Sequence, residues 1–416
     1  MNDVDVIVVG AGAAGLAAMR TLLATGCRAV ALEARHRIGG RVWTDTGDGL
    51  PFDHGASFIH AEHINPWTMI AGRLRFATEV DPRRRMLYVG GRPAGKDEIE
   101  AFGTVRAQAL DQVIAAGRSG QDVSIADAVQ LSGPWAAQGQ VALGPWLLGV
   151  ENDAASVADF AYAAGGRDRL VTIGYGRLVT AYGRGIPVQL GTIVERVDYR
   201  GSGVVVETTL GRLRGRVAIV TLPVGVLTAG QVRFDPPLPL DKQRALEALP
   251  MGLLAKIGLF FDGDPFGLGD TFYLHRHTTD QRAALYLVRP CGHDLVVGFV
   301  GGSLAHELEV AGEAAASAFA LEPLIEIFGS RLRSRLRGAR HTCWGTDPFA
   351  FGSYAVARPG GGATRAVLGL PLADRVLFAG EACAGDGWAA TVAGAHLSGK
   401  RAARAALALL GANDAV

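Results

Sequence analysis

The apolar residues at the start of the chain form two short runs that predict buried strands. Residues 5–9 and 29–32 are mostly β-branched or aliphatic and contain no internal polar break, which is typical of strands covered on both faces. Between them lies an alanine-rich segment that predicts a helix to about residue 25. This succession of strand, helix and strand predicts the beginning of a doubly wound, mainly parallel sheet.

Further along the chain, the pattern predicts a second region and then a return to the sheet. Helical runs at residues 97–117 and 124–131, broken by glycine and proline, indicate a mostly helical insertion. Two paired strands are predicted at residues 187–190 and 192–199, followed by strands at 203–209 and 216–222. After a proline-rich connector at 234–239, the pattern predicts a helix at 242–249, strands at 251–261, 284–288 and 295–300, and helices at 304–320 and 324–336.

The turn after the first predicted strand carries glycines with the spacing G-x-G-x-x-G, at Gly10, Gly12 and Gly15. The first permits a tight turn, the second lets a pyrophosphate approach the backbone, and the third lets the helix pack closely on the strand. Ala14 begins the helix, whose free N–H groups and dipole favour phosphate. Glu33 ends the second strand, where a carboxylate can bind both ribose hydroxyls and disfavours a 2′-phosphate. A Rossmann-type dinucleotide site is predicted, and NADP is not its expected occupant.

The residues that follow, E-A-R-H-R-I-G-G-R, resemble the extended FAD signature of flavin amine oxidases. In that family the second glycine brings a backbone amide to the pyrophosphate, and the last arginine neutralises it with a forked set of donors. The residues that the resemblance assigns to FAD here are Ala34, Arg35, Gly40 and Arg41. A solvated basic loop is the alternative for Arg35 and for Arg37.

A second segment, D-H-G-A-S-F-I-H-A-E-H-I-N-P from residue 53, resembles a segment of polyamine and spermine oxidases, with Phe58 replacing tryptophan and Ala61 replacing glycine. The resemblance implies that the backbone after Asp53 lies along the flavin and that His60 lies at the substrate tunnel. A hydrogen-bonded core histidine is the alternative for His60. Glu62 is the candidate partner for a second ammonium if the substrate is a polyamine. The flavin contacts implied by the segment are Gly55, Ala56 and Ser57.

Lys256 interrupts an otherwise wholly apolar run at residues 251–261. A buried ammonium needs a partner or a function, whereas a lysine on an edge strand can simply face solvent. The run resembles the strand G-x-x-x-K-[VI]-x-L-x-F of amine oxidases, whose lysine holds a water against the N5 atom of the flavin. The resemblance therefore favours a catalytic Lys256 over an edge-strand lysine.

The segment W-G-T-D-P-F-A-F-G-S-Y that ends at Tyr354 resembles another segment of the amine oxidase family. It implies that Tyr354 is an aromatic wall of the site and that Ser353 lies near the flavin ring. Monoamine oxidases with covalent flavin carry a cysteine at the position of Ser353. The serine therefore predicts that FAD is bound without a covalent bond.

The C-terminal part resembles polyamine oxidases and their lysine-demethylase relatives through A-T-V-x-G-A-x-x-S-G-x-R-x-A. The resemblance implies that the start of the last helix points its dipole at the flavin pyrimidine, and that Trp388 replaces a tyrosine of an aromatic cage. A core tryptophan is the alternative. The further FAD contacts implied by the family are Val194 (at the adenine), Gly380, Glu381 (at the ribityl hydroxyls), Thr391 and Val392. A plain strand residue is the alternative for Val194.

The composition excludes several classes of protein. The 416 residues carry a formal net charge of +1, which gives no electrostatic basis for binding nucleic acid. The four cysteines are scattered, which predicts a reduced, cytoplasmic protein without a structural metal. No leader precedes the first strand and no apolar run has the length needed to cross a bilayer, so neither secretion nor membrane insertion is expected.

The expected fold is α/β, a Rossmann-type FAD-binding domain with an interleaved α+β substrate-binding domain like that of polyamine oxidases. The FAD-binding domain is assigned to residues 1–70, 190–250 and 370–416, and the substrate-binding domain to 71–189 and 251–369. The implied activity is FAD-dependent oxidation of a small-molecule amine, with O₂ as the acceptor and H₂O₂ as a product. An L-amino-acid oxidase or desaturase stays open, as do an FAD-bearing interaction module without this activity and a homodimeric assembly.

Overall fold

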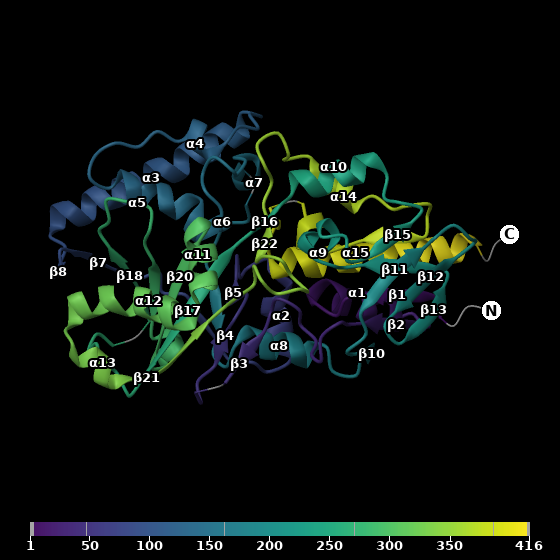
Figure 1. The fold of residues 1–416 in the computed structure, drawn as a ribbon, viewed down its shortest axis with the longest axis horizontal. Coiled ribbons are helices and arrows are strands. Elements are labelled where there is room, and N and C mark those ends of the chain that lie inside the picture. The colour runs from purple at the N-terminus through teal and green to yellow at the C-terminus, as the bar shows by residue number, and fades with distance from the viewer. Residues whose placement is uncertain (1–3, 47, 162, 270, 386, 414–416) are drawn as a thin grey trace.

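The computed structural model describes residues 4–46, 48–161, 163–269, 271–385 and 387–413. It consists of two lobes, each built around one large sheet, and both chain ends lie on the same lobe (Figure 1). Within the described residues, none of the helices combines the length and the apolarity needed to cross a membrane.

The lobe that carries the chain ends is built on a five-stranded parallel sheet in the order β10-β2-β1-β14-β23. Its strands are β1 (Val6–Val9), β2 (Ala29–Leu32), β10 (Val188–Gln189), β14 (Val217–Val220) and β23 (Val376–Phe378). All four side chains of β1 are buried, as expected for a strand covered on both faces. Alternate residues of the sheet therefore contribute to two different cores.

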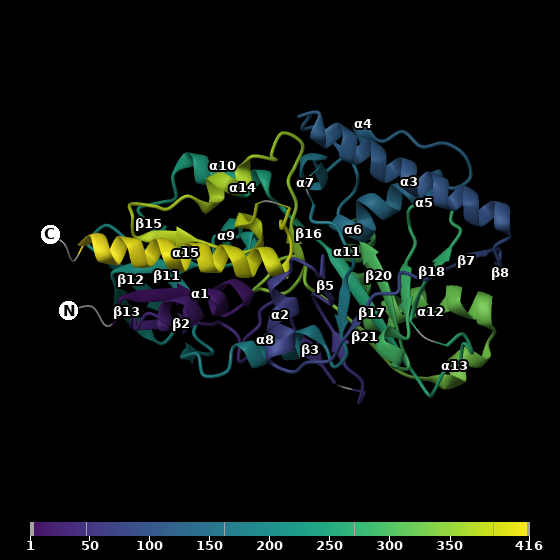
Figure 2. The same cartoon turned by 180° about the vertical axis from the view of Figure 1, so that it is seen from behind.

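One face of this sheet is covered by helices α1 (Ala13–Leu23) and α15 (Val392–Asn413), which lie side by side in both views (Figure 1 and Figure 2). The two helices touch closely because residue 399 is glycine: a Cβ atom there would lie 2.1 Å from the carbonyl oxygen of Ala14. The first and last helices of the described chain are thus fixed against each other.

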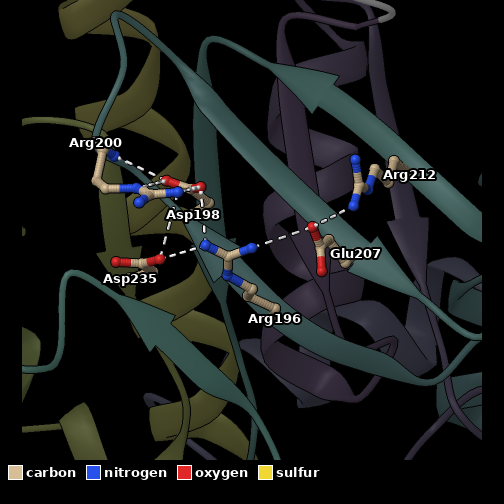
Figure 3. A network of polar contacts seen from close by, with 6 residues as sticks. All are labelled: Arg196, Asp198, Arg200, Glu207, Arg212 and Asp235. Carbon is tan, nitrogen blue, oxygen red and sulfur yellow. Dashed lines mark hydrogen bonds and ion pairs between the residues drawn. The ribbon is translucent and has the colours of Figure 1, made fainter.

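The other face packs on a four-stranded sheet in the order β13-β12-β11-β15. Its strands are β11 (Val194–Asp198), β12 (Val204–Thr208), β13 (Gly211–Gly215) and β15 (Arg233–Asp235). A network of three arginines and three carboxylates crosses its strands (Figure 3). Arg196 is its centre, since its guanidinium contacts Asp198 at 3.2 Å, Glu207 at 3.3 Å and also Asp235.

We expect Arg196→Leu to lower the free energy of unfolding more than Arg212→Leu does, because Asp198, Glu207 and Asp235 would lose their shared cation. Thermal unfolding of the FAD-loaded protein measures the loss. The control is Arg212→Leu, because Arg212 is 72% exposed and contacts only Glu207 of this network. Such an exposed pair contributes less than about 1 kcal/mol. Equal losses in the two variants would contradict a central role for Arg196.

The second lobe is built on a seven-stranded sheet in the order β21-β17-β20-β19-β18-β7-β8. Its strands are β7 (Arg85–Val89), β8 (Arg92–Pro93), β17 (Leu254–Phe261), β18 (Phe272–Arg276), β19 (Leu285–Val288), β20 (Leu295–Gly301) and β21 (Leu336–His341). One face packs on helices α11 (Ser303–Ala311), α12 (Glu313–Phe328) and α13 (Arg331–Arg335). The opposite face carries Lys256 and Phe299 and is turned toward the first lobe's loops.

A group of helices from residues 96–161 completes the second lobe, with α3 lying along its outer edge (Figure 1). They are α3 (Lys96–Arg118), α4 (Ile125–Ala128), α5 (Ala136–Leu143), α6 (Pro145–Leu148) and α7 (Ala158–Ala161). The remaining strands form small sheets: β3 (Thr44–Asp45) with β4 (Phe52–Asp53), β16 (Met251–Gly252) with β22 (Tyr354–Ala355), and β9 (Arg169–Val171) between β5 (Phe58–Ile59) and β6 (Thr78–Val80). The other helices are α2 (Pro66–Arg73), α8 (Tyr175–Tyr182), α9 (Val224–Thr228), α10 (Leu240–Ala248) and α14 (Thr364–Gly369), with short 3₁₀ turns η1 (Pro290–Gly292) and η2 (Glu381–Cys383).

Two predictions of the sequence pattern are wrong. The strands predicted at 187–190 and 192–199 do not pair with each other, because β10 joins β2 in the parallel sheet while β11 pairs with β12 and β15. Gly191, with a φ of +62°, turns the chain between them. The helices predicted at 304–320 and 324–336 instead break at Gly312 and Gly329, both at positive φ, and Pro323 lies inside α12. The domain boundaries stay a prediction.

Candidate active site

Both lobes line one cavity of about 560 Å³. Every residue that the sequence assigned to the cofactor or to catalysis lines it, except Gly15. Gly15 lies behind the turn, where a Cβ atom would sit 1.9 Å from the carbonyl oxygen of Gly10. A glycine is required at this position because the helix and the strand are in close contact there, and not because a ligand approaches it. The geometry brings the predicted residues together, and their individual roles stay predictions.

The glycine turn leaves room for a ligand at Gly12. A Cβ atom there would meet nothing nearer than the Cα atom of Gly40, at 4.0 Å, so its side chain would point into the cavity. Glu33 is buried at the adjoining end of β2, and its carboxylate accepts hydrogen bonds from the backbone N–H groups of Ala11 (2.8 Å) and Arg35 (3.0 Å). These two bonds fix the carboxylate at the cavity wall.

The three arginines of the following loop have different surroundings. Arg35 lines the cavity and donates to Asp347 at 2.8 Å. Arg37 does not line it; its guanidinium lies 4.6 Å from the ring centre of Trp43, and burial lowers its pKa to about 10. Arg41 lines the cavity and donates to the carbonyl oxygen of Ser353 at 2.8 Å. The solvated-loop alternative is therefore wrong for Arg35. Arg37 lies outside the cavity and packs on Trp43, so it stabilises the loop.

Glu381 shows that the site fits a hydroxyl-rich ligand. Its Oε1 atom accepts from Arg41 (3.0 Å) and from the backbone N–H of Ala355 (3.1 Å). Its Oε2 atom is buried and has no hydrogen-bond partner within the described chain. Such an orphaned carboxylate oxygen is costly unless a ligand donates to it. The ribityl hydroxyls of FAD are donors of this kind, so the glycine turn and Glu381 together fit FAD.

Lys256 is buried on β17 and turned toward the loop of residues 53–57. Its Nζ atom donates to the carbonyl oxygen of Asp53 at 2.9 Å, to the carbonyl oxygen of Gly55 and to the Oγ atom of Ser57 at 2.5 Å. Because β17 lies between β20 and β21 and Lys256 is only 5% exposed, the edge-strand alternative is wrong. Burial lowers the pKa of Lys256 to about 8.

These contacts make Lys256 the anchor of the loop that lines the cavity. An ammonium has three N–H donors, and all three are directed at protein acceptors. The loop is also packed tightly against the chain on its other side, because a Cβ atom at Gly55 would lie 1.7 Å from the carbonyl oxygen of Arg41. Burial raises the pKa of the Asp53 carboxyl, while Lys256 opposes that rise. A water at Lys256 would have to replace one of its present partners.

The aromatic and helix-start residues of the C-terminal half lie at the same cavity. Tyr354 is in β22 and donates its hydroxyl to the carbonyl oxygen of Leu147 at 2.7 Å; burial raises its pKa. Trp388 is 8% exposed and lines the cavity, so it is both buried and part of the site. Thr391 begins α15 by accepting from the backbone N–H of Gly394 at 2.9 Å. Val392 and Val194 line the cavity beside them.

His60 lines the cavity, whereas Glu62 does not. The side chain of His60 is 47% exposed, and its Nδ1 atom lies 3.3 Å from Asp168, so it is not a core histidine. It lines the cavity and stacks near Phe58. Glu62 does not line the cavity and pairs with Arg167 at 2.7 Å and Arg169 at 2.5 Å. The prediction that Glu62 binds a second ammonium is therefore wrong.

The sequence did not identify the apolar wall of the cavity. Trp146 in α6, Phe160 in α7, Tyr273 in β18 and Phe299 in β20 all line it. These residues are dispersed over more than 150 positions of the chain and lie in segments without a recognisable motif. Alternation of apolar residues in the seven-stranded sheet could have indicated Phe299, but not which face it is on. In the described part of the chain, no three His, Cys, Asp or Glu side chains gather as metal ligands.

The chain matches the family described as flavin containing amine oxidoreductase over residues 13–128 and 139–407. It is 33% identical over 439 aligned residues to lysine-specific histone demethylase 1 homolog 1 of Oryza sativa subsp. japonica, which covers 96% of this chain and 52% of that protein. It is 28% identical to lysine-specific histone demethylase 2 of Homo sapiens, which covers 97% and 53%. The chain spans about half the length of the curated relatives it matches.

Two solved structures share its fold. A putrescine oxidase double mutant, made to redesign cofactor binding, superposes with a TM-score of 0.81 at 21% identity and covers 97% of this chain and 99% of its own. Cyclohexylamine oxidase from Brevibacterium oxydans IH-35A superposes with a TM-score of 0.80 at 22% identity, covering 98% and 100%. These likenesses confirm the predicted α/β fold, with its Rossmann-type domain and polyamine oxidase-like architecture.

Proposed function

This chain belongs to the family of flavin-containing amine oxidoreductases with FAD as cofactor, and we propose that it acts as an amine oxidase. The reaction would remove two electrons and two protons from an amine, giving an imine that water hydrolyses to a carbonyl compound. O₂ would accept the electrons and protons and leave as H₂O₂. FAD, when bound, supplies the acceptor at its N5 atom for the hydride leaving the α-carbon of the amine.

The observation that carries the proposal is Lys256, buried at the cavity and bonded to the loop of residues 53–57. Binding FAD alone does not require a buried lysine, and burying an ammonium is costly unless it is fully partnered. Its three bonds hold Gly55 and Ser57 at the cavity wall. A positive charge fixed there stabilises negative charge that develops nearby, and it needs no reorganisation during the reaction.

Other residues of the chain prepare the amine. Tyr354 and Trp388 offer aromatic surface at the cavity, against which a neutral amine packs. Exclusion of water by these side chains favours the uncharged amine over its ammonium form. The uncharged form is the reactive one, because its nitrogen lone pair assists departure of the hydride from the neighbouring carbon.

The test is anaerobic reduction of the purified FAD protein by a panel of amines, followed by mixing with O₂. Bleaching of the flavin by an amine and stoichiometric peroxide after mixing are the expected results. A flavin that no amine reduces would contradict an amine oxidase and favour an interaction module. Reduction without peroxide would contradict O₂ as the acceptor and favour a dehydrogenase.

An L-amino-acid oxidase has less support. It needs an arginine for the substrate carboxylate, and the arginines that line the cavity among the described residues are Arg35 and Arg41. Arg35 is paired with Asp347, and Arg41 is paired with Glu381. Neither guanidinium is free to receive a second carboxylate without giving up its present partner.

N-methyl-lysine in a peptide is a second candidate substrate, favoured by the 33% identity to a protein named as a histone demethylase. Oxidation of the N-methyl carbon would release formaldehyde. The protein incubated with a methylated lysine peptide should then give formaldehyde and peroxide in equal amounts. Peroxide from simple amines without formaldehyde from such a peptide would contradict this candidate.

We expect acid precipitation to release all the flavin as free FAD. Ser353, at the position of the cysteine in enzymes with covalent flavin, carries no thiol, and its hydroxyl is bonded to the backbone of Leu254 at 2.9 Å. Absorbance of the supernatant and of the redissolved pellet measures the distribution. Flavin that stays with the precipitated chain would contradict dissociable FAD.

A further inference from the structure

We propose that the substrate of this site is an apolar monoamine rather than the N-methyl-lysine peptide considered above, and that diamines, polyamines and basic peptides are disfavoured. The inference rests on the proposed amine oxidase function and concerns which amines that site accepts. It comes from the wall that the second lobe contributes to the cavity. The wall is made of Trp146, Phe160, Tyr273, Leu285 and Phe299 from the second lobe, and Phe58 of β5 lines the cavity with them.

The polar atoms of this wall are bonded to the protein. The hydroxyl of Tyr273 donates to Asp81 at 2.9 Å, and the indole N–H of Trp146 donates to the carbonyl oxygen of Ala283 at 2.8 Å. The hydroxyl of Tyr354 likewise donates to the backbone at Leu147. Each of these donors already has its acceptor, so the rings present mainly carbon to a ligand.

Asp159 is the carboxylate that the second lobe contributes to the lining, and it is neutralised. Its oxygens accept from Arg365 at 3.0 and 2.7 Å in a forked pair, and its Oδ2 atom also accepts from the backbone N–H of Ala357 at 2.8 Å. The two side chains are 10% and 7% exposed. A buried pair of this geometry leaves little negative charge for a substrate cation.

The carboxylates just behind the wall and at the His60 side of the cavity are also occupied. Asp81 accepts from Tyr273 and from the backbone N–H of Arg83. Asp168 lies 3.3 Å from His60 and 3.4 Å from Arg83, and it also accepts from the backbone of Ala61. Glu62 is held by two arginines. Arginines therefore accompany the acids on this side, which disfavours a strongly basic peptide.

These contacts lead to a selectivity rule. The amine that reacts enters uncharged, and a carbon chain packs on the wall. A second amine at the far end of that chain would remain an ammonium and would lie against this wall, where the described residues offer no free carboxylate. The same chain without the second nitrogen has no such cost.

The experiment compares hexylamine with 1,6-diaminohexane, which have the same carbon chain. We expect kcat/KM to be at least a hundredfold higher for hexylamine, which corresponds to about 3 kcal/mol at 1.4 kcal/mol per factor of ten. Equal values, or a preference for the diamine, would overturn the inference while leaving the amine oxidase function intact. A lysine-methylated basic peptide that outperforms hexylamine would overturn it as well.

A binding measurement separates this inference from the activity. The probe is 1,1,3,3-tetramethylbutylamine, which has no hydrogen on the carbon that carries nitrogen and cannot be oxidised there. It should raise the melting temperature of the FAD protein or perturb its flavin spectrum, whereas 1,6-diaminohexane at equal concentration should not. Binding of the diamine alone would overturn the inference. A flavin that no amine reduces, despite binding of the probe, would instead contradict the proposed function.

Tyr273→Phe provides a matched variant, since it keeps the ring and removes the donor to Asp81. Asp81 lies behind the wall and does not line the cavity itself, so the variant tests whether uncovering its oxygen is enough to bind a distant ammonium. The ratio of kcat/KM for 1,6-diaminohexane to that for hexylamine should rise about tenfold, as for one newly formed charged hydrogen bond. An unchanged ratio would contradict the masking of carboxylates as the source of selectivity.

Discussion

A Gly12→Val variant is expected to fold and to contain no FAD. Residue 12 has a φ of −75° and a ψ of −173°, an extended conformation that valine adopts without strain. A Cβ atom at this position meets open space up to the Cα atom of Gly40, 4.0 Å away, and that space belongs to the cavity. The valine methyl groups would therefore occupy the path of the pyrophosphate while leaving the packing of β1 on α1 intact.

The measurement is the ratio of flavin to protein after purification, followed by titration of the variant with FAD. We expect affinity to fall by on the order of a hundredfold or more, which corresponds to about 3 kcal/mol. Gly103→Val is the control, because Gly103 lies on α3 and a Cβ atom there meets nothing within 4 Å. A Gly12→Val protein with one FAD per chain would mean that the pyrophosphate lies elsewhere.

Lys256→Met is expected to slow the reaction of the reduced enzyme with O₂ by on the order of a hundredfold, which corresponds to about 3 kcal/mol. The substitution removes the fixed charge at the cavity and releases the loop of residues 53–57. It also costs stability, because the carbonyl oxygens of Asp53 and Gly55 lose a buried donor. Each lost partner costs about 1–3 kcal/mol.

Stopped-flow mixing of anaerobically reduced enzyme with O₂ measures the rate directly. Lys242→Met is a matched control: Lys242 is also buried and donates to three carbonyl oxygens, those of Val367, Leu368 and Leu370. Because Lys242 does not line the cavity, its variant should lose stability but keep the rate of the oxygen reaction. Equal rates in the two variants would show that Lys256 is needed only for folding.

The sequence was most informative where the backbone itself contacts the ligand. Gly12 and Glu33 stand at fixed offsets from a strand and a helix, so local spacing is sufficient to predict their positions. Lys256 could be recognised because a charge within an apolar strand is physically exceptional. What the sequence could not supply was the set of three acceptors around its Nζ atom, because they come from a loop about two hundred positions earlier.

Pairing between distant strands was the weaker part of the prediction. The run before Gly191 and the run after it both have the composition of strands, but composition does not specify a partner. The pairing partners follow from the three-dimensional arrangement. In it, β10 is the edge strand beside β2 in the parallel sheet, and β11 lies between β12 and β15 in the other sheet. The strand β18, which was not predicted, supplies Tyr273 to the cavity. The substrate wall therefore became recognisable only in three dimensions.

The close contact of α1 with α15 also determines when the protein can hold its cofactor during synthesis. The glycine turn leaves the ribosome first, and Glu381 and Val392, which line the same cavity, emerge about 370 to 380 residues later. Until the last helix docks on Ala14, the turn around Gly12 is one half of a binding site. Nascent chains halted before that helix would remain without FAD, and cofactor capture would report that α15 has been made and has docked.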